Sequence, residues 1–106
     1  MIIRTINSQG TISNRGSIIY SAPTGSTGYI DNIKFNNNKD ENYTLSLYRY
    51  ISNSRSKVLV YKYELSAGDM IDDGQPYQIK GGDHLYAIAN SEVVFTINGT
   101  ESITSR

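Results

Sequence analysis

The chain has 106 residues, no cysteine, and 10 basic and 10 acidic side chains. This length is that of a single domain, and the lack of cysteine excludes disulfides and thiolate metal sites. A formal net charge of +0, with Lys and Arg scattered along the sequence, argues against nucleic acid or an anionic membrane as a partner.

Only 38% of the residues are hydrophobic, below the roughly 45–50% of an average globular protein. There are 9 tyrosines against 2 phenylalanines and no tryptophan. Tyrosine can bury its ring while its hydroxyl stays in water, so it suits thin cores and interfaces equally. This composition favours an all-β protein with a small core and a large contact surface.

Residues 1–16 mix apolar residues with turn formers. They are predicted to be an edge strand or an N-terminal arm that orders only against a partner, ahead of a β-sandwich domain over 17–106. The segment lacks the apolar stretch and small-residue cleavage site of a signal peptide. No apolar run approaches the roughly 20 residues that span a bilayer. We therefore expect a protein that stays soluble where it is made.

From residue 17 onward, apolar and polar residues alternate with the period of a half-buried strand, and no helical period runs without breakers. The strands predicted from this alternation are 17–22, 29–36, 42–50, 57–65, 77–80, 84–90 and 93–98. About seven or eight short antiparallel strands joined by tight polar turns make a β-sandwich. The strand order is left open between jelly-roll and immunoglobulin-like, because both show the same local alternation.

The turns between these strands contain one phrase twice, LSAGDMI and IKGGDHL. Gly68 and Gly82 are expected to adopt positive φ there. Asp69 and Asp83 are expected to accept hydrogen bonds from nearby backbone N–H groups and so close the turns. In the earlier loop APTGSTG, Pro23 fixes one φ angle at a further predicted turn.

Four aspartates in this region are the one candidate calcium site: Asp69, Asp72, Asp73 and Asp83. The segment DMIDDG lacks the alternating oxygen ligands and the distal Glu of an EF-hand loop, so turn chemistry is the preferred interpretation. His84 is the only histidine, too few ligands for a structural zinc site, and is expected to be a packed or surface residue. No catalytic or nucleotide-binding motif is present. The sequence therefore predicts no enzyme and no cofactor.

Four tyrosines are candidates for a contact surface. Tyr48 and Tyr50 share one face of the predicted strand 42–50. Tyr61 and Tyr63 share one face of the next strand, 57–65, with Leu59 and Leu65. Buried, such residues pack a core; exposed, they anchor a protein interface or stack on sugars. All three roles are left open.

The landmarks follow a recognisable order: a strand reaching YSAP, a Gly-containing turn, a strand with a terminal Asn, two central strands, two Gly-Asp turns and a last strand ending near a Glu. The matching positions are Tyr20, Pro23, Ile33, Asn36, Leu65, Ala67, Gly68, Asp69, Ile79, Gly82, Asp83, Leu85 and Glu101. Over 17–101 the chain resembles small β-sandwich virion structural proteins of tailed bacteriophages. The acidic segment before residue 77 departs from that pattern, and residues 1–16 have no counterpart in it.

This resemblance implies a non-enzymatic structural protein of the virion, of the capsid-decoration, neck or tail-accessory type. It implies a homo-oligomer that contacts copies of itself and other virion proteins such as the major capsid protein, after synthesis in the host cytoplasm. The alternative is a carbohydrate-binding or receptor-binding module of a tail or head fibre. A third hypothesis, a hydrolytic enzyme, requires a pocket that joins His84 to the acidic loop.

Overall fold

The computed structural model describes residues 2–90 and 92–103, and these residues form strands and turns only. No helix among them is long and apolar enough to cross a membrane. The strands are β1 (Ile2–Ile12), β2 (Ser17–Ser21), β3 (Ser26–Asn36), β4 (Tyr43–Ile51), β5 (Ser56–Leu65), β6 (Met70–Asp73), β7 (Tyr77–Lys80), β8 (His84–Ala89) and β9 (Val93–Ile103). The all-β prediction is confirmed.

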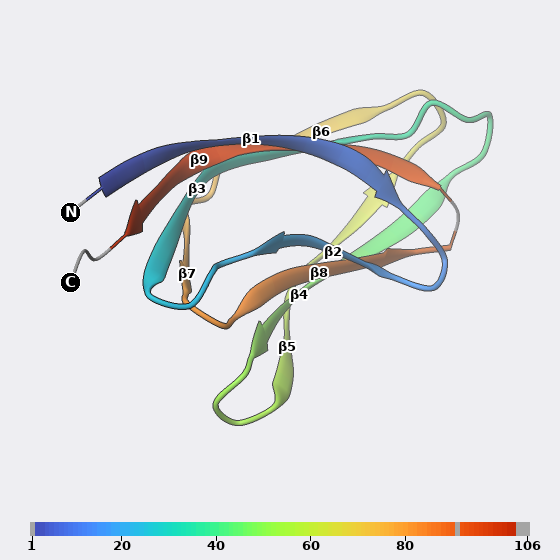
Figure 1. Cartoon of the computed structure of the whole chain (residues 1–106). Coiled ribbons are helices and arrows are strands. Elements are labelled where there is room, and N and C mark those ends of the chain that lie inside the picture. Colours follow the sequence, from blue (N-terminus) through green and yellow to red (C-terminus); the bar gives the residue numbers. More distant parts are fainter. Residues whose placement is uncertain (1, 91, 104–106) are drawn as a thin grey trace.

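Two antiparallel sheets face each other (Figure 1). Sheet A has the order β1-β9-β3-β6, with β7 also paired to β3, and sheet B has the order β2-β8-β4-β5. β6 pairs with residues 33–36 of β3 and β7 with residues 27–30, so these two short strands together form one interrupted edge.

The strand order is that of a jelly roll. When β6 and β7 are counted as one strand, every connection crosses from one sheet to the other except the β4–β5 hairpin. An immunoglobulin-like sandwich instead keeps neighbouring strands of the chain together in a sheet more often. The structure therefore decides between the two orders that local alternation leaves open.

The core lies between the two sheets, as the period-two pattern predicts. Leu45 and Leu47 of β4 are fully buried, as are Phe35 of β3 and Ile97 of β9. Their neighbours in sequence point outward, because successive side chains of a strand alternate between faces.

The prediction for β5 is only half right. Tyr63 and Leu65 are buried, but Leu59 is 52% exposed and Tyr61 51% exposed. Between Leu47 and Tyr48 of β4 the register shifts, so that Leu47 pairs with Tyr61 and Tyr48 with Leu59. The extra residue on β5 turns Leu59 to the outer face, as bulges do.

Residues 2–12 form β1, an edge strand paired with β9 along its whole length. Ile6 and Ile12 reach the core, so β1 is part of the sandwich rather than a separate arm. The sequence pattern missed β6, because its four residues are too short and too acidic to show alternation. With β1 and β6 the described residues form nine strands, more than the predicted seven or eight.

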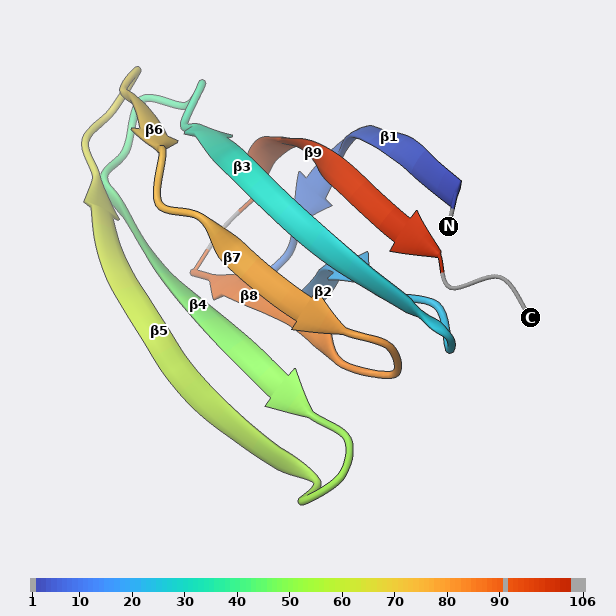
Figure 2. The same ribbon diagram turned by 90° about the vertical axis from the view of Figure 1, so that its left-hand side faces the viewer.

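The turns gather at two opposite ends of the molecule, which is 50 Å long. At one end, called here the hairpin end, backbone hydrogen bonds join Ala22 to Gly82 and Asp83, and Asp83 also binds Ser52. At the other end, called the loop end, the N–H of Asn37 donates to the carbonyl of Asp69. Figure 2 shows the β4–β5 hairpin extending away from the rest of the sandwich at the hairpin end.

Candidate functional site

The repeated Gly-Asp phrase forms the same turn twice. The N–H of Asp69 donates to Ser66 O at 3.0 Å, and the N–H of Asp83 donates to Lys80 O at 2.9 Å. The preceding glycines, Gly68 and Gly82, have φ of 76° and 91°, as the third residue of a type II turn requires.

The side chain of Asp83 does not close its own turn. Its Oδ1 accepts hydrogen bonds from the backbone N–H and the hydroxyl of Ser52 in the β4–β5 hairpin. The expectation that each carboxylate closes its turn is therefore wrong for Asp83. The backbone closes this turn, and the side chain of Asp83 joins the β7–β8 turn to the β4–β5 hairpin. In the earlier loop, the carbonyl of Pro23 accepts the N–H of Ser26 at 3.0 Å, which closes that turn in the same way.

The four aspartates of the candidate calcium site do not come together. Asp83 lies at the hairpin end with Ser52, whereas Asp69 lies at the loop end. Asp72 points outward from β6 and accepts from Asn32, and Asp73 points into the core. Within residues 2–90 and 92–103 no group of three or more acidic, His or Cys side chains could hold a metal ion.

His84 is packed against the outer face of sheet B. Its ring stacks on Tyr50, with centroids 4.5 Å apart and planes 14° apart. Burial first, and then the charge of Lys57, lower the pKa of the imidazole below its ordinary value, which keeps it neutral near pH 7. This position matches the packed or surface role expected from the sequence.

The four candidate tyrosines occupy two different faces. Tyr48 and Tyr50 are half-buried on the outer face of sheet B, since they alternate with the buried Leu47. Tyr61 and Tyr63 face inward, because cross-strand partners share a face and theirs are inward-facing residues of β4. Tyr61 is exposed beside the open edge, whereas Tyr63 is 8% exposed. Tyr63 is therefore a core residue and not an interface residue.

An apolar and aromatic row crosses the full width of the outer face of sheet B, with one residue from each strand. The pairs Ile18–Tyr86, Tyr86–Tyr48 and Tyr48–Leu59 are cross-strand partners. The rings of Tyr48 and Tyr86 pack edge to face, with centroids 6.3 Å apart. The surface called here the aromatic face consists of Ile18, Tyr48, Tyr50, Leu59, His84 and Tyr86.

Two buried carboxylates join the sheets through tyrosine hydroxyls. Tyr63 of sheet B and Tyr77 of sheet A both donate to Oδ2 of Asp73, Tyr77 at 2.6 Å. On the other side of the core, Tyr20 of sheet B donates to Oε2 of Glu101 in sheet A at 2.8 Å. Charge-assisted hydrogen bonds of this kind are stronger than neutral ones, so each carboxylate helps to hold the two sheets together. Each buried carboxylate with its tyrosine partners is called here a latch.

High pH is expected to release these latches. Burial, and then the hydrogen bond to the carboxylate, raise the pKa of Tyr20, Tyr63 and Tyr77 above the ordinary value of 10.0. Because the folded pKa is the higher one, this stabilisation is complete below pH 10 and is lost as the pH rises toward the folded values. The melting temperature should therefore fall as the pH is raised from about 10 to about 12.

The Tyr20→Phe variant should show a shallower fall over the same interval, because one titrating hydroxyl is gone. Exposed Tyr29 has no such latch, and Tyr29→Phe serves as the matched control. A melting temperature that does not change across this interval would contradict the argument.

Sequence reasoning also missed Asn37. This side chain is 0% exposed, and its Nδ2 lies 2.7 Å from Glu41 O and 3.1 Å from both Leu65 O and Ser66 O. It fastens the β3–β4 loop to the β5–β6 turn at the loop end. The family pattern places its terminal Asn at position 36, but Asn36 is exposed; only the three-dimensional contacts identify its neighbour as the structural residue.

An open polar cleft of about 760 Å³ lies between the β4–β5 hairpin and the β7–β8 turn. This cleft is called here the hairpin cleft. It is lined by Arg49, Ile51, Ser52, Asn53, Arg55, Gln78, Lys80, Gly81 and Asp83. Arg49 donates to the carbonyl of Gln78 across the cleft. The described lining carries three cationic side chains and a single carboxylate, which Ser52 already occupies.

Arg55 is the only residue other than glycine with positive φ in the described part of the chain, at 54°. Side chains with a Cβ are disfavoured in this region. The N–H of Arg55 donates to Ser52 O at 3.3 Å, and a left-handed residue is usual at this position of a hairpin turn. The hairpin cleft and the aromatic face are thus the two candidate contact surfaces.

No protein-family model and no curated protein matches the chain. Solved structures do resemble it in fold. A structure of Bacillus endospore appendages, described as disulfide-linked pili, is 14% identical, covers 98% of this chain and 88% of its own, and has a TM-score of 0.52. The Drosophila NLP core, described in terms of pentamer formation and histone binding, is 13% identical. The match covers 96% of this chain and 99% of the NLP core, with a TM-score of 0.56.

A structure of infectious bursal disease virus is 11% identical, with coverages of 94% and 30% and a TM-score of 0.36, too low to support any argument. At such identities the first two structures establish only the fold. The chain is thus a jelly-roll β-sandwich with two candidate contact surfaces.

Proposed function

We propose that this protein is a non-enzymatic structural component of a tailed-bacteriophage virion, either a capsid decoration or a head–tail neck accessory protein. It acts through contacts with copies of itself and with other virion proteins. The aromatic face is the observation that carries this proposal. The two similar structures come from a pilus and from a pentamer-forming protein, which supports assembly as a use of this fold.

The aromatic face has the chemistry of an interface. Ile18 is 57% exposed and Leu59 52% exposed at opposite margins of sheet B, with the rings of Tyr48 and Tyr86 between them. Contiguous exposed apolar surface marks protein contact sites, and tyrosine is enriched among residues that dominate binding energy. The row is apolar across all four strands, although the Lys57 ammonium lies 4.1 Å from the centre of the Tyr86 ring. Such a row is best buried against another flat surface.

The side chains with catalytic potential are engaged in structural contacts. Asp73 and Glu101 accept hydrogen bonds from tyrosines inside the core, and His84 stacks on Tyr50. A hydrolytic site would need His84 and the acidic segment in one pocket, but His84 stacks on Tyr50 at the outer face of sheet B, and neither it nor Asp72 lines the hairpin cleft. These contacts support the non-enzymatic part of the proposal.

Charging the aromatic face should abolish self-association. The wild type is expected to form oligomers in size-exclusion chromatography with light scattering, whereas Leu59→Asp and Ile18→Asp should elute as monomers with unchanged circular dichroism. The matched control is Met70→Asp, an exposed apolar residue of sheet A that is 62% exposed; it should leave the oligomer intact. A wild type that is monomeric at every concentration and absent from purified particles would refute the proposal.

A carbohydrate-binding or receptor-binding fibre module is the second candidate, and the polar hairpin cleft favours it. Arg49, Asn53 and Gln78 line an open cleft, and jelly rolls include lectin domains. This role predicts a row of exposed side chains among Tyr48, Tyr50, Tyr61 or Tyr63. Tyr61 is exposed, Tyr48 and Tyr50 are half-buried, and Tyr63 is buried. Saturable glycan binding by a monomer, lost in Asn53→Ala, would favour this candidate over assembly.

A further inference from the structure

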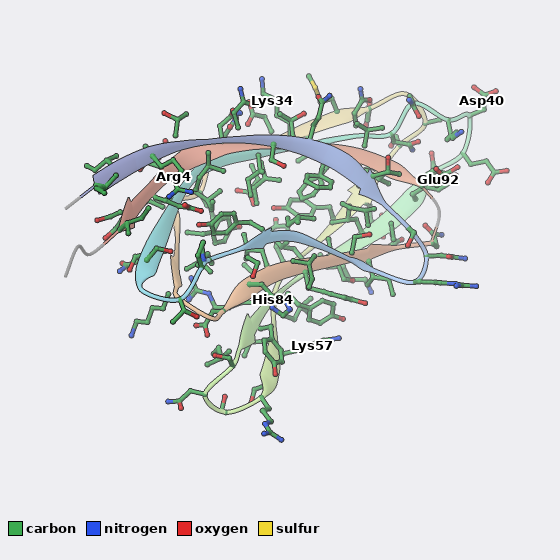
Figure 3. All side chains as sticks on the ribbon, in the orientation of Figure 1. Arg4, Lys34, Asp40, Lys57, His84 and Glu92 are labelled. Carbon is green, nitrogen blue, oxygen red and sulfur yellow. The ribbon has the colours of Figure 1, made fainter. Side chains whose placement is uncertain are left out.

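The net charge of zero conceals a strong separation of charge along the molecule. Among the described residues, the hairpin end carries five cationic side chains against two carboxylates, and the loop end five carboxylates against two cations. The first group comprises Arg4, Arg49, Arg55, Lys57 and Lys80, with Asp83 and Glu101. The second comprises Asp40, Glu41, Glu64, Asp69 and Glu92, with Arg15 and Lys39. Figure 3 shows Asp40 and Glu92 together at one end, with Arg4 and Lys57 away from them.

The hairpin end offers a concave receptor for negative charge. Arg55 and Lys80 are exposed and line the hairpin cleft with Arg49. Both carboxylates of this end are already engaged, Asp83 by Ser52 and Glu101 by Tyr20. The described lining of the cleft therefore keeps three cationic side chains against the single negative charge of Asp83. Guanidinium groups in this position favour carboxylates, which they bind with paired hydrogen bonds.

The loop end offers a convex ligand of the matching chemistry. Asp40 and Glu41 are consecutive and exposed in the β3–β4 loop. The side chain of Asn37 holds the base of this loop through the carbonyl of Glu41, so the two carboxylates are presented on a fixed base. A preordered loop loses less conformational entropy on binding than a flexible one.

We propose that the hairpin cleft of one copy binds the β3–β4 loop of the next copy, with Arg55 and Lys80 facing Asp40 and Glu41. This inference rests on the proposed role in assembly and adds to it a second contact, distinct from that of the aromatic face. The two surfaces are different and lie at opposite ends of a 50 Å molecule, so the contact is head-to-tail. Head-to-tail contacts generate rings or filaments, and repetition of a weak contact in such an assembly gives avidity.

Paired charge reversals test this geometry. Arg55→Glu with Lys80→Glu makes both ends acidic, and Asp40→Lys with Glu41→Lys makes both ends basic. Each double variant alone should lose self-association by about tenfold or more, because like charges then meet. An equimolar mixture of the two should associate again, since every contact can pair opposite charges. Misfolding cannot produce such a rescue. Sedimentation velocity at about 0.01 M salt, where screening is weak, and at about 1 M salt measures both effects.

Two controls separate this contact from other effects of charge and strain. Lys34→Glu reverses a charge on sheet A, where Figure 3 shows Lys34 apart from both Asp40 and Lys57, and should leave association unchanged. Arg55→Gly removes the side chain and relieves the positive φ. It should fold at least as stably as the wild type and still associate more weakly.

Three results would overturn the inference. They are a mixture that fails to restore association, reversed variants that associate as the wild type does, and a wild type that is monomeric at low salt. If association persists in the reversed variants but is lost in Leu59→Asp, only this geometry fails and the proposed assembly role stands. If purified particles lack the protein, the proposed function itself fails.

Discussion

Replacing Asp73 with alanine is expected to lower the free energy of unfolding by about 3 kcal/mol. The carboxylate is 8% exposed and accepts from the hydroxyls of Tyr63 and Tyr77. Its Oδ1 also accepts the N–H of Gln75 at 2.9 Å. In the variant, two buried hydroxyls lose their acceptor, and each unsatisfied group costs about 1–3 kcal/mol. Urea unfolding followed by circular dichroism measures the loss.

Two further variants isolate the latch from general effects of mutation. Asp73→Asn keeps one carbonyl acceptor, so its loss should be smaller than that of Asp73→Ala. Asp72→Ala removes the adjacent carboxylate, which is exposed on β6 and bonded to Asn32, and should change stability by no more than about 0.5 kcal/mol. If Asp73→Ala and Asp72→Ala proved equally mild, the latch would contribute nothing to stability.

The parts of the fold that follow from local pattern could be predicted from the sequence. Alternation at Leu45 and Leu47, and again at Phe95 and Ile97, identifies inward faces because burial between two sheets imposes a period of two. The Gly-Asp turns could be predicted for a similar reason: a glycine with positive φ is a local requirement of the turn, whatever lies across the core.

The parts that depend on distant contacts could not be predicted. Tyr20 and Glu101 are 81 residues apart in sequence, and nothing near either residue indicates that they share a hydrogen bond. The same holds for Asn37, whose partners include Leu65 O. On β5, the bulge opposite Leu47 and Tyr48 changes which side chains are buried. A bulge depends on the pairing of two strands, so neither strand alone reveals it.

The candidate contact surfaces likewise emerge only when strands are assembled. Ile18, Tyr86 and Leu59 come from three separate segments, and sheet pairing alone places them in one row with Tyr48. The separation of charge has the same origin. Cations and carboxylates alternate irregularly along the sequence, but antiparallel strands return the chain to the same two ends, where like charges accumulate. The protein has no net charge, but the fold places an excess of cations at the hairpin end and an excess of carboxylates at the loop end.

Gly99 is expected to tolerate no side chain, and Gly99→Ala should cost about 3 kcal/mol or more of unfolding free energy. Gly99 lies in β9 between Ile6 of β1 and Ile30 of β3. A Cβ at this position would lie 2.0 Å from the backbone oxygen of Tyr29. A backbone atom of a paired strand cannot move aside as a flexible side chain can, so the pairing of β9 with β3 must be disturbed.

The matched control is Gly74→Ala, where an added Cβ meets no atom within 4 Å. Its φ lies outside the left-handed region, so alanine should be neutral or slightly stabilising there, by up to about 1 kcal/mol. Thermal unfolding of the two variants should therefore give shifts of opposite sign or very different size. Equal melting temperatures would mean that β3 and β9 are not held at the register that positions both the Glu101 latch and the edge strand β1.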